Sequence, residues 1–251
     1  MTVLNPPLPL AVPLERGSNL RDLGGWRTAG NALVRSGVLY RSAALADPSA
    51  ADRAAIAALG LRTICDFRGS EERRRAPVQI AGAETIPVPV EPTVGAGLRD
   101  ILATREATGE DLMTLLRRAY EDYALGCTAQ FARFFALLRE PGRLPLMFHC
   151  SAGKDRTGFA AALVLSAVGV PWDVVTADYL ATNRLWRRDT VASHDLSPAL
   201  AAMLLGAHLE LLEAAFAAIR RTDGSIDAYL ERALGLDDAA RQQLRDLLLA
   251  A

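Results

Sequence analysis

Residues 144–158 read LPLMFHCSAGKDRTG, which joins an apolar run to a short loop and the start of a helix. The run Leu144–Phe148 has the length and the apolar character of a buried strand. Residues 158–168, GFAAALVLSAV, are apolar on every face, so we expect a helix in the middle of the protein. A strand, a tight loop and a buried helix in this order predict one unit of an α/β fold.

The segments on either side extend the same pattern. Strands are predicted over residues 63–67 (TICDF) and 84–90 (ETIPVPV), the second at a sheet edge because of its prolines, and a hairpin is predicted from strands at 26–28 and 32–40. Helices are predicted over residues 47–59, 108–125, 128–138, 171–186, 200–221, 226–234 and 239–249. We therefore expect a single α/β domain over residues 19–251, with a mostly parallel central sheet flanked by helices and a helical C-terminal part. Residues 1–18, which contain four prolines, are expected to form an extended arm.

The composition excludes several classes of protein. Of the 251 residues, 51% are hydrophobic and 23% are charged, which is typical of a chain with a sizeable core. The net charge of −1 argues against a protein that coats nucleic acid, and the chain has no run of eighteen apolar residues that would predict a membrane span. Three cysteines indicate a reducing compartment, and the first residues lack the basic start of a signal peptide. We expect a cytoplasmic protein without stable membrane insertion; export by an unconventional route and the oligomeric state stay open.

The loop between the predicted strand and helix has the residues of an anion site with a nucleophile. Cys150 follows the strand directly, and Arg156 comes six positions later, where the helix begins. A tight loop at a helix N-terminus turns backbone N–H groups towards a bound anion, and a guanidinium holds two phosphate oxygens. The same positive field stabilises a thiolate, so Cys150 is a candidate nucleophile.

Three other interpretations fit the loop less well. A nucleotide-binding P-loop needs Gly at position 148 and Ser or Thr at position 155, where this chain has Phe and Asp. A structural cysteine would not be followed by Gly153, Lys154 and Arg156. A rhodanese-type persulfide loop is shorter and lacks an arginine at this spacing.

The segment HCSAGKDRTG, residues 149–158, resembles the signature of the cysteine-dependent protein tyrosine phosphatases. Its Lys-Asp pair is similar to the atypical bacterial branch, whose members act on phosphotyrosine and often on phosphoinositides. Further segments that resemble this branch are NLRDLGGWRT (19–28), LYRSAAL (39–45), CDFRGSEER (65–73), DYLATN (178–183) and GSIDAYLERALGL (224–236). The resemblance implies a phosphomonoester hydrolase without a cofactor, with phosphotyrosine proteins or phosphoinositides as partners. The alternatives are a phosphoinositide phosphatase, an inactive phosphate-binding module and a sulfurtransferase.

The resemblance also implies roles for the loop residues. Cys150 forms a cysteinyl-phosphate that water hydrolyses, Arg156 holds the phosphoryl oxygens, and His149 supports the loop. The expected phosphate-binding residues are Ser151, Ala152, Gly153, Lys154, Arg156 and Thr157, the last of which also has its hydroxyl near the sulfur. No histidine has the spacing of a metal ligand, so no metal is expected.

The general acid is expected to be an aspartate. Asp155 would repel a phosphate unless it is protonated or turned outward, and the Lys-Asp-Arg pattern of the branch implies that it protonates the leaving oxygen. The chain has no Trp-Pro-Asp segment upstream. Asp66, at the end of a predicted strand, is therefore the second candidate, followed by Asp111 and Asp122; a salt-bridged structural carboxylate is the alternative for each.

Other residues keep two interpretations. Lys154, the single lysine of the chain, either meets the extra phosphates of an inositol headgroup or is a solvated side chain on the rim. Cys65 either forms a reversible disulfide with Cys150 or is an ordinary buried cysteine. Four polar residues at predicted strand ends either bind a ligand or hold one another: Asn19, Arg21, Asp22 and Arg41.

Overall fold

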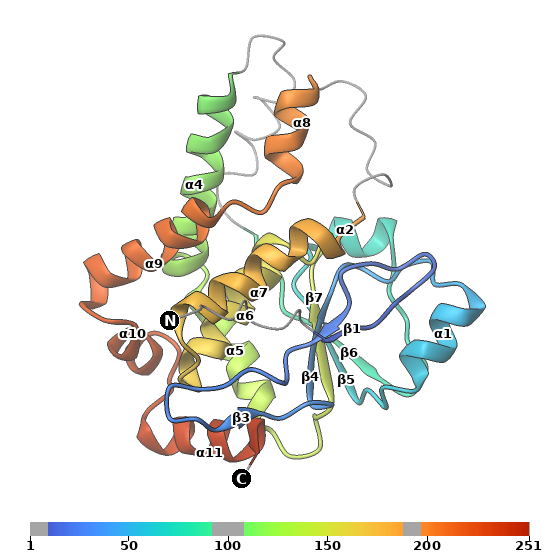
Figure 1. Cartoon of the computed structure of the whole chain (residues 1–251), viewed down its shortest axis with the longest axis horizontal. Coiled ribbons are helices and arrows are strands. Elements are labelled where there is room, and N and C mark those ends of the chain that lie inside the picture. The colour runs from blue at the N-terminus through green and yellow to red at the C-terminus, as the bar shows by residue number, and fades with distance from the viewer. Residues whose placement is uncertain (1–9, 92–107, 188–196, 251) are drawn as a thin grey trace, which may run out of the picture.

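A six-stranded sheet forms the centre of the protein in a computed structural model that describes residues 10–91, 108–187 and 197–250 (Figure 1). The strands lie in the order β1 (Leu10–Ala11), β2 (Arg21–Asp22), β4 (Leu39–Ser42), β7 (Leu146–His149), β5 (Thr63–Asp66) and β6 (Glu84–Pro87). From β4 to β6 the strands are parallel, whereas β1 and β2 pair antiparallel. The mostly parallel sheet is confirmed, and β6 lies at the edge, as its prolines predict.

The register brings the carboxyl ends of three parallel strands to one edge of the sheet. Ser42 at the end of β4 and Asp66 at the end of β5 both lie opposite His149, the last residue of β7. The loop after His149 therefore leaves the sheet between polar residues of both neighbouring strands. This is the edge at which open α/β sheets bind ligands.

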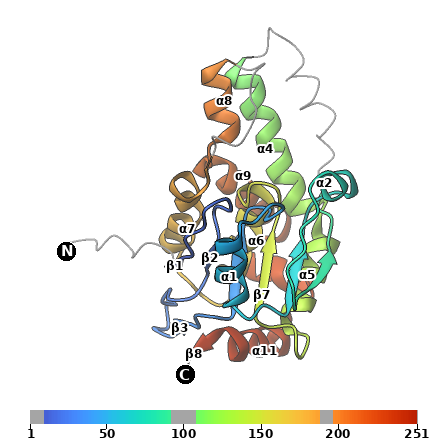
Figure 2. The same cartoon turned by 90° about the vertical axis from the view of Figure 1, so that its right-hand side faces the viewer.

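Helices cover both faces of the sheet (Figure 2). They are α1 (Ala50–Ala57), α2 (Ser70–Arg75), α4 (Gly109–Leu125), α5 (Thr128–Arg139), α6 (Asp155–Ala167), α7 (Trp172–Leu185), α8 (Pro198–Leu205), α9 (Leu209–Asp223), α10 (Ile226–Arg232) and α11 (Asp238–Leu248). On one face, Ile56 of α1 packs in a small core with Tyr40, Ile64 and Met147. The larger core lies on the other face, where α6 is buried at every position from 157 to 165, which confirms the expected central helix.

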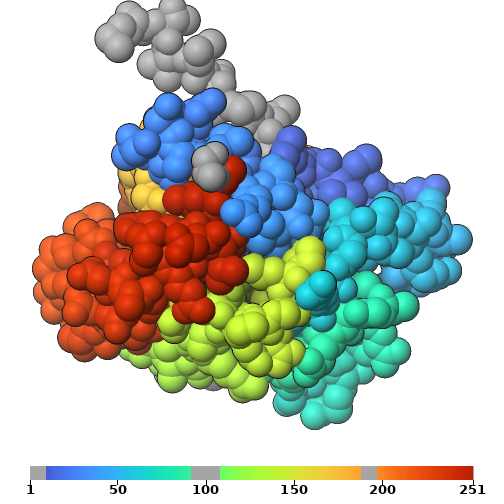
Figure 3. All heavy atoms as spheres, turned by 90° about the horizontal axis from the view of Figure 1, so that it is seen from below, coloured from blue at the N-terminus to red at the C-terminus, as the bar shows by residue number. Residues whose placement is uncertain are grey.

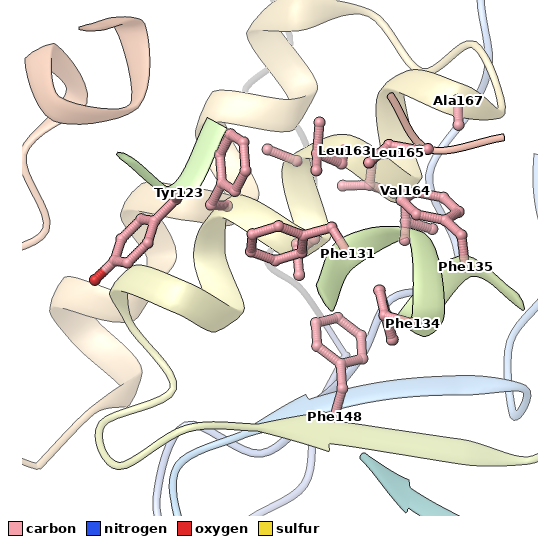
Figure 4. Close-up of a cluster of buried hydrophobic side chains, with 14 of the residues drawn as sticks. Tyr123, Phe131, Phe134, Phe135, Phe148, Leu163, Val164, Leu165 and Ala167 are labelled. Atoms are coloured by element: carbon pink, nitrogen blue, oxygen red, sulfur yellow. The ribbon is translucent and has the colours of Figure 1, made fainter. Parts of the chain in front are cut away.

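Aromatic side chains of α5 connect Phe148 of β7 with α6 in the larger core (Figure 4). The ring centroids of Phe134 and Phe148 are 5.0 Å apart, and those of Phe131 and Phe159 are 5.1 Å apart. All four side chains are fully buried. Because Phe148 stands two residues before Cys150, this packing fixes the end of the strand from which the candidate nucleophile follows.

The predicted hairpin near the N-terminus is partly wrong. Backbone hydrogen bonds do join Thr28 and Ala32 across a turn, in which Asn31 has a φ of 66°. The second predicted strand, however, is divided at Gly37, which has a φ of 79°. Its first part becomes β3 (Leu33–Val34), which pairs with β8 (Leu249–Ala250) in a separate two-stranded sheet, and its second part becomes β4.

The C-terminal helices lie against elements from distant parts of the chain (Figure 3). α11 packs on α5, and the backbone N–H of Arg35 donates to the carbonyl oxygen of Leu248 at 2.7 Å. At the other end, Leu10–Ala11, in the stretch predicted as an extended arm, adds β1 to the central sheet.

The predicted continuous helix over residues 200–221 is also wrong, because the chain bends by 47° between α8 and α9. Gly206 leaves the helical conformation there, with φ −76° and ψ 148°. The side chain of Asn183 bonds the backbone of Ala207 in both directions, at 2.8 Å each. Within the described residues, no single helix has the length and apolar character that crossing a membrane requires, although α8 and α9 together reach them.

Candidate active site

The candidate loop runs from the end of β7 to the first residue of α6. Cys150 is 3% exposed, and α6 begins at Asp155, three residues before its predicted start. Gly153 has a φ of 65°, and a Cβ atom on it would lie 2.4 Å from the carbonyl oxygen of Ser42. Only glycine therefore fits where the loop crosses the end of β4.

Two side chains hold carbonyl groups of the loop. Asn19 Nδ2 donates to the carbonyl oxygens of Ala152 and Gly153 at 2.9 and 3.0 Å, and Arg41 Nη2 donates to that of Gly153 at 2.9 Å. In a planar trans peptide the N–H group points opposite to the C=O group. The N–H groups of Gly153 and Lys154 are thereby turned away from Asn19 and Arg41, as an anion site requires.

A buried ion cluster of β2, β4 and α7 supports these contacts. Asp178 accepts from Arg21 Nε at 2.9 Å and from Arg41 Nη1 at 2.5 Å, and all three side chains are at most 1% exposed. Burial raises the pKa of Asp178, but the two guanidinium groups outweigh this effect and lower it below its usual value. Two cations on one anion leave a net positive charge next to the loop. Of the four residues with two interpretations, Asn19, Arg21 and Arg41 thus hold the loop and one another.

Arg156 forms a bidentate ion pair with Glu72 of α2, a residue that sequence reasoning missed. Nη1 and Nη2 each lie 2.8 Å from one carboxylate oxygen, and the hydroxyl of Ser151 donates to the same carboxylate. Burial opposes ionisation of Glu72, but its hydrogen bonds with Arg156 outweigh burial and lower its pKa to about 2. Burial lowers the pKa of Arg156, whereas its hydrogen bonds with Glu72 contribute most to raising it above its usual value. Donors of the loop therefore converge on an anion close to the candidate nucleophile.

His149 and Asp66 lie opposite each other at the ends of β7 and β5, and their buried surroundings determine their protonation. His149 Nδ1 is 3.0 Å from the carbonyl oxygen of Cys150, and since a carbonyl only accepts, this nitrogen carries the proton. Burial lowers the pKa of His149, so the ring is neutral at pH 7. Asp66 is 1% exposed and pairs with Arg68 at 2.8 Å. Burial raises the pKa of Asp66, but Arg68 outweighs it and lowers the pKa below the usual value. A buried, ion-paired Asp66 does not suit the predicted role of proton donor.

Asp155 contacts a pair of buried tyrosines that sequence reasoning also missed. The hydroxyl of Tyr120 donates to Asp155 Oδ1 at 2.8 Å and lies 2.7 Å from the hydroxyl of Tyr179. The two tyrosines come from α4 and α7. Tyr120 lies in a segment that was predicted only as a helix, whereas Tyr179 lies in DYLATN (178–183), which resembles the phosphatase branch without indicating a contact with the loop.

Lys154 is not the solvated side chain on the rim that one of its two interpretations predicted. It is 3% exposed, and Nζ donates to the carbonyl oxygens of Leu204 and Gly206 at 2.5 and 2.9 Å. The same nitrogen is 3.5 Å from Asp155 Oδ1. The ammonium group thus connects the loop to the turn between α8 and α9.

The remaining predicted residues lie in structural positions. Thr157 is buried, and its hydroxyl has no hydrogen-bond partner among the described residues, so the expected bond to the sulfur is not formed. Asp22 accepts from the backbone of Gly24 at 2.7 Å and holds a turn. Asp111 caps the exposed start of α4, and Asp122 lies against Gly126 at the end of that helix.

Cys65 lies in the core of the protein. Cys65 is fully buried opposite Phe148 in the neighbouring strand, and burial raises the pKa of its thiol. Its environment is that of an ordinary core cysteine.

In the part of the chain that the structure describes, no group of three or more His, Cys, Asp or Glu side chains is arranged to hold a metal ion.

Comparison with known proteins identifies similar sequences. The sequence model of the tyrosine phosphatase family matches residues 12–250. The chain is 37% identical over 242 residues to a protein of Cupriavidus necator named as a tyrosine-protein phosphatase, which covers 93% of this chain and 86% of the relative. It is 30% identical over 270 residues to the triple specificity protein phosphatase PtpB of Mycobacterium tuberculosis, and the match covers 92% of this chain and 96% of the relative. A crystal structure of P. aeruginosa TpbA in complex with pTyr matches 77% of this chain and 96% of its own, at 20% identity and a TM-score of 0.33.

Proposed function

The chain belongs to the tyrosine phosphatase family and is a protein tyrosine phosphatase, and from that premise we propose that it hydrolyses phosphotyrosine through a cysteinyl-phosphate on Cys150. One observation carries the proposal: Arg156 and Ser151, the residue that directly follows Cys150, converge on one carboxylate. A phosphoryl group is also an anion, and it offers a guanidinium two acceptor oxygens in a similar geometry. The donors that hold Glu72 are therefore the donors that a phosphoryl group needs.

The proposed reaction has two steps. In the first, the Cys150 thiolate attacks phosphorus, the S–P bond forms as the bond to the tyrosyl oxygen breaks, and Asp155 gives its proton to that oxygen. Arg156 and the loop N–H groups stabilise the charge on the other three oxygens. In the second step water attacks phosphorus and loses a proton to Asp155, and the thiolate leaves as inorganic phosphate forms.

Asp155 is the best placed of the candidate acids. Its side chain is 26% exposed at the first residue of α6, adjacent in the chain to Arg156. Asp66 is held as an anion by Arg68, and Asp111 is used as a helix cap. A general acid must lie within hydrogen-bond reach of the leaving oxygen, which favours Asp155.

Phosphoinositides form the second proposed substrate class. Support comes from the Lys154-Asp155 pair, which resembles the bacterial branch whose members often act on phosphoinositides. The expected recognition of extra phosphates by Lys154 would require its ammonium group to exchange the carbonyl oxygens of Leu204 and Gly206 for phosphate. Phosphotyrosine is for this reason the substrate that we place first.

Cys150→Ser tests the proposal. The variant is expected to lose about 10⁴-fold or more in kcat on a phosphotyrosine peptide while it still binds that peptide, because a serine hydroxyl is not ionised at pH 7. Cys127→Ser, which changes another buried cysteine, is the control and is expected to keep most of its activity. Wild-type rates on phosphotyrosine peptide, phosphoserine peptide and phosphoinositide give the order of substrates, and EDTA should not change them.

The opposite outcomes are equally clear. A Cys150→Ser protein that keeps most of its rate contradicts the cysteinyl-phosphate. A wild-type protein that binds phosphotyrosine peptide but turns over no aryl phosphate is a binding module. Turnover of thiosulfate without turnover of phosphate esters identifies a sulfurtransferase.

A further inference from the structure

We propose that Tyr120 is the positioning residue of the general acid: its hydroxyl holds Oδ1 of Asp155, so that Oδ2 carries the proton given to the leaving group. The inference rests on the proposed function, in which Asp155 is that acid. Tyr120 itself contacts neither the substrate nor the reacting atoms in this proposal. It acts by fixing which oxygen of Asp155 faces them.

The donors around Asp155 meet on one of its two oxygens. Tyr120 donates to Oδ1 at 2.8 Å, and Lys154 Nζ lies 3.5 Å from that same atom. Among the described residues, no hydrogen bond or ion pair engages Oδ2. An oxygen that accepts the Tyr120 hydroxyl and faces the Lys154 ammonium group carries a proton less readily than the other oxygen. The acid proton is accordingly assigned to Oδ2.

Tyr120 is itself held rigidly and stays a donor. It is 1% exposed, and its hydroxyl lies 2.7 Å from that of Tyr179. Because the proton of Tyr120 goes to Asp155, the Tyr179 hydroxyl donates to Tyr120, and the carbonyl oxygen of His208 lies 3.3 Å from Tyr179. Burial raises the pKa of both tyrosines above the usual value, so both hydroxyls keep their protons at neutral pH. A fixed donor lowers the number of orientations open to the carboxyl group, which keeps Oδ2 in the geometry of proton transfer.

Other charged and titratable groups face Asp155 from its own segment and from α4 and α7. They are Lys154, Arg156, Tyr120, Tyr123 and Tyr179. Lys154 forms the ion pair with Oδ1, but it also donates to the carbonyl oxygens of Leu204 and Gly206, so its removal would disturb the turn between α8 and α9 as well. The hydroxyl of Tyr120 can be removed without changing charge or shape.

Tyr120→Phe is the test, measured on two substrates. With phosphotyrosine peptide, whose leaving oxygen needs a proton, kcat is expected to fall about tenfold with little change in KM, a part of the 10²–10⁴-fold that a general acid contributes. With p-nitrophenyl phosphate, whose leaving group needs no proton, kcat should fall less than about twofold. Tyr229→Phe removes another buried hydroxyl, which donates to the carbonyl oxygen of Ala124, and is the matched control expected to affect neither substrate.

A double-mutant cycle with Asp155→Asn separates positioning from packing. If Tyr120 acts through Asp155, Tyr120→Phe changes nothing further in the Asp155→Asn protein. Equal losses on both substrates, or additive losses in the cycle, would overturn the inference. If Asp155→Asn alone lacks leaving-group dependence, the proposed function of Asp155 fails instead, whatever Tyr120 does.

Tyr179→Phe keeps the inference testable if Tyr120→Phe does not fold. Loss of the Tyr179 hydroxyl frees that of Tyr120 to move, so a smaller loss confined to phosphotyrosine peptide is expected. A Tyr179→Phe protein that loses rate equally on both substrates would contradict the inference.

Discussion

Gly153 is the residue at which the loop depends most directly on the absence of a side chain. Any other residue would have to adopt a φ of 65°, and its Cβ atom would lie 2.4 Å from the carbonyl oxygen of Ser42. Each of these two effects destabilises the loop separately. A positive φ alone costs an alanine about 1–2 kcal/mol. The contact with Ser42 is a contact with backbone, which cannot rotate away.

Gly153→Ala is expected to lower the free energy of unfolding by more than Gly142→Ala does. Gly142 has a φ of 80° with no atom within 4 Å of a built Cβ, so that variant shows the conformational cost alone. Gly153→Ala should also weaken inhibition by inorganic phosphate, because the loop has to move off Ser42. Chemical denaturation and phosphate inhibition measure the two effects. Identical unfolding curves for the two variants would contradict the close contact.

Among single residues, the sequence was most informative where the chemistry is local. Cys150, Asp155 and Arg156 lie within seven consecutive positions, so their spacing predicts their proximity. Glu72 and Tyr120 join the site from α2 and α4, at sequence separations of 84 and 35 residues. Such contacts depend on how helices pack, which no local pattern contains.

At the scale of elements, α2 is a short helix whose first turn serves two purposes. Glu72 accepts from the backbone N–H of Gly69 at 2.9 Å, which caps the helix, and it also pairs with Arg156. The pKa of Glu72 is about 2 in the folded protein, whereas its ordinary value is 4.5. Because the pKa of Glu72 is lowered in the folded protein, its ionised carboxylate stabilises the fold at pH values above 4.5, its ordinary pKa. This contribution is lost as the pH falls from about 4.5 towards 2.

Glu72→Gln is therefore expected to be less stable than wild type at pH 7, with the difference shrinking as the pH is lowered through that window. Its side chain is 38% exposed, so solvent screening reduces the effect. Glu71→Gln is the control, since Glu71 pairs with Arg75 on the surface. Unfolding midpoints between pH 7 and pH 2.5 measure the difference. A difference in unfolding midpoint between Glu72→Gln and wild type that stays constant with pH would contradict the lowered pKa of Glu72.

The elements themselves were predictable where local rules and tertiary packing agree. The helix predicted from residue 47 is present, but it begins two residues later than a cap at Asp47 would give, because the hydroxyl of Ser49 accepts from the backbone N–H of Asp52 at 3.1 Å. The apolar run before His149 is a buried strand. The division of residues 200–221 into α8 and α9 was not predictable, because Asn183 and Lys154 hold the turn from distant parts of the chain.

At the scale of the whole molecule, the Arg21–Asp178–Arg41 cluster joins the N-terminal strands, the loop and α7. Asp178→Asn would leave two buried guanidinium groups without a counterion, which costs about 3–5 kcal/mol. We expect that loss in the free energy of unfolding, together with weaker phosphate inhibition, since Arg41 also holds Gly153. Asp47→Asn, in a solvent-exposed pair with Arg16, should remain close to wild type. Equal stabilities of the two variants in urea would show that the cluster contributes nothing.

The position of the one lysine has a practical consequence for the intact protein. Lys154 is the single lysine of the chain, and its amine is enclosed between the loop and the turn after α8. Reagents that acylate amines therefore have one side-chain target, and they reach it only when Leu204 and Gly206 separate from the loop. The rate at which Lys154 is acylated therefore reports how often the loop and the turn separate, and mass spectrometry measures it without an introduced label.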